Sequence, residues 1–109
     1  MSEAEDFYCE EALSGNTPVE IVEETETILA FHHTRPFWPV HIVVIPKVHV
    51  ASLLTIDDDG LLIELLDVVK RAAAVVVEKE GAARVLTNLG KYQDSKHLHF
   101  HVISGEQIR

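Results

Sequence analysis

The chain has 109 residues and a formal net charge of −9, and hydrophobic residues make up 47% of it. This length predicts a single domain, residues 1–109, that can bury a core without disulfide bonds. The acidic balance argues against binding extended nucleic acid, because contact with a phosphate backbone requires clustered Lys and Arg.

The chain has one cysteine, Cys9, and no long apolar run. A single cysteine can form neither an internal disulfide nor a multi-cysteine zinc site. No run approaches the roughly 20 apolar residues of a membrane span, and the acidic start MSEAEDF is unlike a signal peptide. We therefore expect a cytoplasmic protein with no membrane partner.

The first third of the chain predicts an antiparallel meander. Residues 1–6 are expected to be flexible, and a short helix is expected over Phe7–Leu13 before the turn at Ser14–Pro18. Alternation of apolar and polar residues predicts a strand over 19–24, with a second over 27–33. Prolines around Trp38 interrupt regular structure, and the β-branched run 40–45 predicts a third strand. Connections this short allow only antiparallel pairing.

The longest predicted element is a helix that ends at Gly81, a typical stop residue. Thr55 followed by Asp58 resembles a capping box. Apolar residues then recur at helical spacing, namely Leu61, Leu62, Leu65, Leu66, Val69, Ala72, Ala73, Val76 and Val77. Two further strands are expected over 84–89 and 96–103. The pattern predicts an α+β fold, with an antiparallel sheet of about five strands covered by one long helix and a short N-terminal helix.

The last predicted strand carries His97, His99 and His101 at alternate positions. Side chains alternate between the faces of a strand, so these three imidazoles are expected to share one face. A second histidine cluster surrounds the third strand, and if that strand shares a sheet with the last one, His41 can join the row.

Three interpretations of this histidine row are open. The row could be the polar face of an edge strand. It could contribute to a metal site, although its Cα atoms span about 13 Å, too far for one ion without a ligand from another strand. Imidazole also has a pKa near 6.5, so one ring can attack while its neighbours handle protons. We favour the third interpretation, with no metal, and transfer at phosphorus as the chemistry.

Two stretches of the chain resemble a known family. The stretch His97–Ile103, HLHFHVI, resembles the histidine triad (HIT) motif. Upstream, Phe31–His49 resembles the family's run of Phe, Pro and His that leads into an aliphatic strand and Pro-Lys-x-His, and Asn88–Gly90 resembles its Asn-x-Gly turn. The similarity runs from about Phe7 to Gln107 and is closest to the histidine-triad nucleotide-binding branch. It implies a HIT-like fold, a homodimer with one sheet continuing across both subunits, and no cofactor.

The resemblance also implies a reaction. It implies hydrolysis or transfer at the α-phosphate of a nucleotide, with a purine mononucleotide or phosphoramidate as ligand. His99 would be the nucleophile and form a nucleotidyl-histidine, His101 would contact the phosphate, and His97 and His41 would help to move a proton to the leaving group. The nucleotide-binding positions would be Phe31, His33, Asn88, Gln93 and Ser95. The alternative is a nucleotide-binding protein of the same fold with little or no turnover.

The sequence departs from the family pattern at several positions. His33 replaces a common aspartate, and a neutral imidazole has only one acceptor nitrogen for sugar hydroxyls. Asp94 stands where a small hydroxyl residue usually touches the phosphate, so Ser95 is expected to take over that contact. Cys9 lacks a neighbouring cysteine, so no structural zinc is expected. Little chain follows the triad before Arg109, whereas in relatives the tail helps to shape substrate choice.

Overall fold

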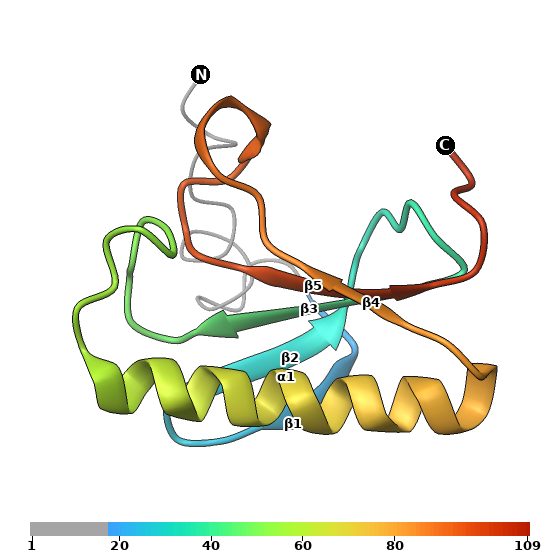
Figure 1. The fold of residues 1–109 in the computed structure, drawn as a ribbon, viewed down its shortest axis with the longest axis horizontal. Helices are drawn as coiled ribbons and strands as arrows, with labels where there is room; N and C mark the ends of the chain where they lie inside the picture. The colour runs from blue at the N-terminus through green and yellow to red at the C-terminus, as the bar shows by residue number, and fades with distance from the viewer. Residues whose placement is uncertain (1–17) are drawn as a thin grey trace.

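The computed structural model describes residues 18–109. The helix predicted over Phe7–Leu13 and Cys9 lie outside the described residues. Within them, a sheet of five antiparallel strands is covered on one face by a single long helix (Figure 1). The predicted α+β class, with its meander and long helix, is confirmed.

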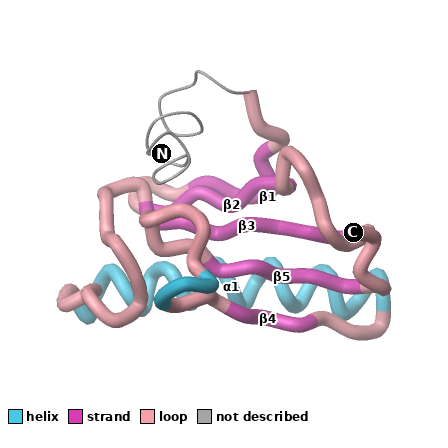
Figure 2. Tube along the Cα trace, turned by 90° about the horizontal axis from the view of Figure 1, so that it is seen from above, coloured by secondary structure: helices cyan, strands magenta, loops and turns pink. Residues whose placement is uncertain are grey.

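The strands pair in an order that differs from their order in the chain. The sheet runs β1-β2-β3-β5-β4, with the helix along one side (Figure 2). The bounds are β1 Ile21–Glu24, β2 Ile28–His32, β3 Val40–Pro46, β4 Arg84–Leu86 and β5 Phe100–Ser104. Because β5 inserts between β3 and β4, the end of the histidine motif lies beside the strand that carries His41.

The last two strands are shorter than the sequence predicts. β4 ends at Leu86 instead of residue 89, and β5 begins at Phe100 instead of residue 96. The backbone N–H of Leu98 donates to the carbonyl of Val50 (2.6 Å), and the Thr87 hydroxyl donates to the carbonyl of His99 (2.7 Å). These contacts replace the bonds of a strand ladder, but the faces still alternate, because Leu98 belongs to the same core cluster as Phe100 and Val102.

The long helix, α1, spans Asp59–Glu80. The predicted capping box is wrong in its first residue, because the N-cap is Asp58, whose carboxylate accepts a hydrogen bond from the N–H of Leu61 (3.0 Å). Thr55 instead closes a turn with Ser52. Gly81 ends the helix in the left-handed conformation (φ 88°), as predicted.

The core lies between α1 and the sheet. The helix buries five side chains there, namely Leu65, Val68, Val69, Ala72 and Val76. Leu66 and Val77, which the periodicity included, are 43% and 46% exposed, and Val68 takes their place because the buried stripe is narrower than the apolar pattern. The opposite face carries a smaller buried cluster of Leu29, Phe31, Val43 and Ile45. In this part of the chain no helix is long and apolar enough to span a membrane.

Candidate active site

The register of β3 and β5 brings two distant histidines together. His101 lies opposite Val43, and His41 lies opposite Ile103. Residues that face each other across an antiparallel pair share a face, so His41 and His101 are diagonal neighbours on the side away from α1. Their rings lie 5.0 Å apart.

These two rings line a cavity of about 370 Å³. The loop between β2 and β3, the segment before β5 and the C-terminal segment complete its wall. The lining residues are His33, Phe37, Trp38, His41, Leu86, Asn88, Asp94, Ser95, His99, His101 and Gln107. Four imidazoles therefore meet in one cavity, drawn from three separate parts of the chain.

A chain of hydrogen bonds determines which nitrogen of each ring carries a proton. The backbone N–H of Phe37 donates to Nδ1 of His41 (3.1 Å), so that nitrogen carries no proton. The proton of neutral His41 is then on Nε2, which lies 2.8 Å from Nδ1 of His101 and donates to it. Neutral His101 consequently carries its proton on Nε2, where it is a hydrogen-bond donor.

His99 has the opposite arrangement. Its Nδ1 lies 2.7 Å from the carbonyl oxygen of His97 and must donate to it, because a carbonyl can only accept. The lone pair of neutral His99 is therefore on Nε2. The ring lies 4.9 Å from that of His101, edge to face, and both line the cavity. One basic nitrogen and one imidazole donor thus belong to adjacent rings.

His97 lies outside this cavity. Its side chain is fully buried, Nε2 donates to the carbonyl of Pro46 (2.8 Å), and its ring packs edge to face against His49. The chain bends at His97 before β5 begins, and His97 is not among the residues that line the cavity. His97 acts on the site through its carbonyl, which orients His99.

Burial keeps the imidazole cluster neutral. Burial, followed by repulsion from His33 and His99, lowers the pKa of His41 to about 4. Burial, followed by repulsion from the other three rings, lowers the pKa of His101 to about 3. Burial also lowers the pKa of His99, against the opposing effects of its bond to His97 and of the Asp94 carboxylate. The cavity therefore presents neutral imidazoles at pH 7.

Aromatic side chains pack around His41. The His33 ring stacks on it at 4.4 Å, and the Trp38 ring meets it edge to face at 5.3 Å. Nδ1 of His33 accepts a hydrogen bond from the N–H of Arg35 (2.9 Å), so the one acceptor nitrogen of neutral His33 is already engaged. His33 is thus a half-buried part of the cavity wall.

The structure gathers most of the residues predicted for nucleotide binding and separates two of them. His33, Asn88 and Ser95 line the cavity. Phe31 is buried in the cluster on the same face of the sheet but is not among the lining residues. Gln93 is also absent from the lining, because its side-chain amide donates to the carbonyl of Ala51 (2.6 Å).

Several lining residues were not predicted as part of the site. Leu86 lies at the end of β4, Phe37 in the proline-rich loop and Gln107 in the C-terminal segment. Gln107 carried no signal in the sequence, since it belongs to no motif. Phe37 belongs to the stretch Arg35–Pro39, for which the prolines predicted only irregular structure.

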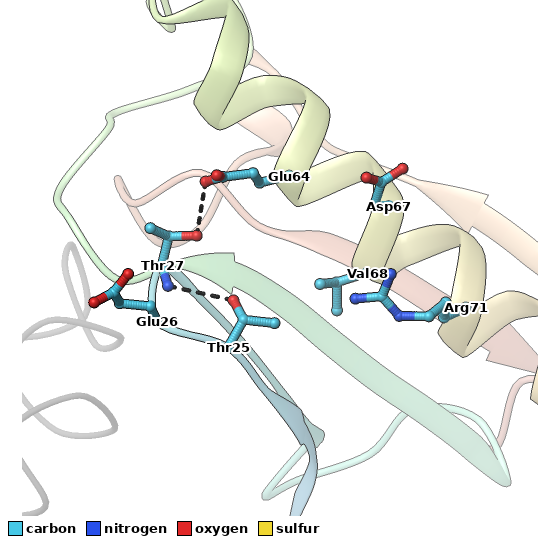
Figure 3. Close-up of a pocket in the computed structure, with 7 residues that line it drawn as sticks. All are labelled: Thr25, Glu26, Thr27, Glu64, Asp67, Val68 and Arg71. Atoms are coloured by element: carbon cyan, nitrogen blue, oxygen red, sulfur yellow. Dashed lines mark hydrogen bonds between the residues drawn. The ribbon is translucent and has the colours of Figure 1, made fainter.

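A second cavity, of about 190 Å³, lies at the turn between β1 and β2 (Figure 3). In its wall the Thr27 hydroxyl donates to Glu64 (2.8 Å), and Arg71 pairs with Glu23 (2.6 Å). Among residues 18–109, no group of three or more His, Cys, Asp or Glu side chains is arranged to hold a metal ion.

Comparison with known proteins identifies the family. The HIT domain model matches residues 14–108. An uncharacterised HIT-like protein of Synechococcus elongatus is 37% identical over 108 residues, covering 96% of this chain and 95% of the relative. A similar protein of Helicobacter pylori is 35% identical over 104 residues, or 90% and 95% of the two chains.

Solved structures agree with this match. A HIT family hydrolase of Legionella pneumophila superposes with a TM-score of 0.79 at 31% identity, over 95% of this chain and 96% of the other. A hypothetical histidine triad nucleotide-binding protein of Sulfolobus tokodaii gives 0.82 at 31% identity, over 90% and 67%. The fold and histidine cluster therefore define a histidine triad protein. The chain belongs to the HIT domain family.

Proposed function

We propose that this protein is a nucleotide hydrolase or transferase that acts at the α-phosphate of a nucleoside phosphoramidate or related purine nucleotide. The nucleophile is Nε2 of His99, which forms a covalent nucleotidyl-histidine. The observation that carries this proposal is the bond from Nδ1 of His99 to the carbonyl of His97. It leaves the basic lone pair of the neutral ring on Nε2, as nucleophilic catalysis requires.

In the first step, Nε2 of His99 bonds to phosphorus and the bond from phosphorus to the leaving nitrogen breaks. The positive charge that develops on His99 is stabilised by the His97 carbonyl, which accepts the hydrogen bond from Nδ1. The leaving amine takes the electron pair and one proton. That proton comes from an imidazole of the cluster, because a bound phosphoryl anion raises the pKa of the rings around it.

In the second step, water attacks phosphorus and the bond to Nε2 of His99 breaks. The proton lost by water returns to the imidazole that gave one up, so the products are the amine and a nucleoside monophosphate. Throughout, Nε2–H of His101 can donate to a phosphoryl oxygen, since Nδ1 is occupied by His41. Preorganised donors of this kind stabilise charge in the transition state.

A trapping experiment tests this proposal. The protein is incubated with a panel of nucleoside phosphoramidates, quenched rapidly, and its intact chain weighed by mass spectrometry. We expect a nucleotidyl adduct on the native protein and on His32→Ala, an exposed histidine at the end of β2, and none on His99→Gly. An adduct that persists in His99→Gly would contradict the assignment of the nucleophile.

The second candidate function is nucleotide binding without useful turnover. Two features favour it. Asp94 places a carboxylate in the cavity wall, where it repels a phosphate, and the acceptor nitrogen of His33 is already occupied by Arg35. Calorimetric binding of a nucleoside monophosphate, with no adduct and no product from any substrate of the panel, would support this candidate over the first.

The proposal also includes a homodimer and a cytoplasmic setting. In the described chain, β4 is an edge strand, so a sheet could continue from it into a second copy. Apolar side chains are exposed on β4 and on α1, including Val85 (47%), Ile63 (61%) and Leu66 (43%). Light scattering coupled to gel filtration should give twice the chain mass, and Val85→Lys should reduce it towards one chain.

A further inference from the structure

The C-terminal segment packs against the loop between β2 and β3 (Figure 1), and residues of both segments line the cavity. The N–H of Ile108 donates to the carbonyl of Phe37 (2.7 Å), and Nε of Arg109 donates to the carbonyl of Pro36 (3.2 Å). The Gln107 amide, which lines the cavity, donates to the carbonyl of Arg109 (2.8 Å). These bonds hold Arg109 beside the cavity.

Two arginines lie near His33. The Cζ atom of Arg109 lies 5.0 Å from the centre of the Phe37 ring, which in turn lies 5.7 Å from the His33 ring. The backbone N–H of Arg35 donates to Nδ1 of His33 (2.9 Å). After burial and the charge of His99, the positive charges of Arg109 and then Arg35 lower the pKa of His33, which agrees with the position of Arg109 beside Phe37.

Neither arginine has an ion-pair partner among the described residues. Among residues 18–109, no carboxylate lies within ion-pair distance of Arg35 or Arg109, although Lys47 and Arg71 are paired with Glu24 and Glu23. This is notable in a chain of net charge −9. Of the three guanidinium nitrogens of Arg109, only Nε makes a hydrogen bond among the described residues, so the two terminal nitrogens remain available as donors.

The acidic and basic groups around the cavity act on different rings. Of the described residues that line it, Asp94 is the only acid, and its carboxylate acts on His99. The arginines act on His33, whose ring stacks on that of His41 at 4.4 Å. A ligand with its reacting phosphoryl group at His99 would thus have a second, positively charged contact region beside His33.

We propose that Arg35 and Arg109 form a subsite for a second anionic group of the ligand, separate from the phosphoryl group that His99 attacks. This inference rests on the proposed function and extends it to the substrate class, a nucleotide with two anionic groups. Guanidinium groups suit the role because their planar donors match carboxylate and phosphate oxygens. The second group could belong to the sugar, as a 2′- or 3′-phosphate, or to the leaving group, as a carboxylate.

Two pairs of probes distinguish these sources. The first compares adenosine 5′-monophosphate with adenosine 2′,5′-bisphosphate and adenosine 3′,5′-bisphosphate by calorimetry. The second compares kcat/KM for an adenosine phosphoramidate of glycine, with its free carboxylate, and the matching glycine amide. At low ionic strength, we expect at least one pair to favour the anionic member by roughly tenfold, because charge-assisted hydrogen bonds are strong and exposed charges are screened by salt.

Substitution of the arginines completes the test. Arg35→Gln with Arg109→Gln should abolish the preference while leaving the mononucleotide bound or turned over. The control, Lys70→Gln, removes a positive charge from the exposed side of α1 and should keep the preference. A preference that survives in the double variant, or no preference in any pair while adenosine 5′-monophosphate binds, would overturn the subsite alone. No binding or turnover of any nucleotide would overturn the proposed function and the subsite together.

Discussion

The neutral histidine cluster should make folding stability fall as the pH is lowered from 7 to 5. The unfolded chain binds protons at histidine near pH 6.5, whereas the folded protein holds the pKa of His41 at about 4 and that of His101 at about 3. Between these values the unfolded state binds more protons, so acid favours unfolding. The stability these groups contribute is fully present above pH 6.5 and is lost progressively below it, down to the folded pKa values.

The expected loss follows from these shifts. Proton linkage gives about 2 kcal/mol for each ring between pH 7 and pH 5, and about 4 kcal/mol for both if they titrate separately. This is a large part of the roughly 5–15 kcal/mol by which domains are stable. The His41–His101 hydrogen bond couples the two rings, so the measured sum should lie at or below this value.

The assay is urea unfolding followed by circular dichroism of α1 at pH 7, 6 and 5. The double variant His41→Asn with His101→Asn is the comparison, because the carboxylates that also titrate are the same in both proteins. The free energy of unfolding should fall more steeply with acid in the native protein than in the variant. The account of the buried neutral cluster would be refuted if the free energy of unfolding fell equally with pH in both proteins. NMR titration midpoints near 6.5 for these two rings in the folded protein would refute it as well.

Three further predictions concern single residues. Asp58→Ala should lower the free energy of unfolding by about 1 kcal/mol in urea titrations, because it removes the acceptor for the N–H of Leu61. Gly105→Ala should lower the free energy of unfolding by more than about 1 kcal/mol, since Gly105 has a φ of 91° and an added Cβ would lie 2.8 Å from Cγ of Pro39. Gly81→Ala is the control, because a Cβ there meets open space, and a smaller loss for Gly105→Ala than for Gly81→Ala would contradict this reasoning. Asp94→Ser should increase the rate of adduct formation in the trapping experiment, because it removes a repulsive carboxylate from the cavity; an unchanged or lower rate would show that the carboxylate is not inhibitory.

Local patterns predicted the elements and most of the candidate site. The β-branched run of β3 and the apolar periodicity of α1 were sufficient because strands and helices expose their faces at regular intervals. His41, His99 and His101 were singled out before any fold was known, and the structure places them in one cavity. The error in the capping box was local too, since the helix begins four residues after Thr55.

The sequence alone identified which residue types could react, and the tertiary structure decided which of them meet and in what protonation state. Regular spacing placed His97 in the row, but its bond to Pro46 and the bend before β5 take it out of the cavity. The positions of Gln107 and Arg109 depend on packing against the loop around Phe37, some 70 residues earlier in the chain. Spacing along a chain reports only on neighbours within one element, whereas burial, hydrogen-bond partners and pKa arise from segments that folding brings together.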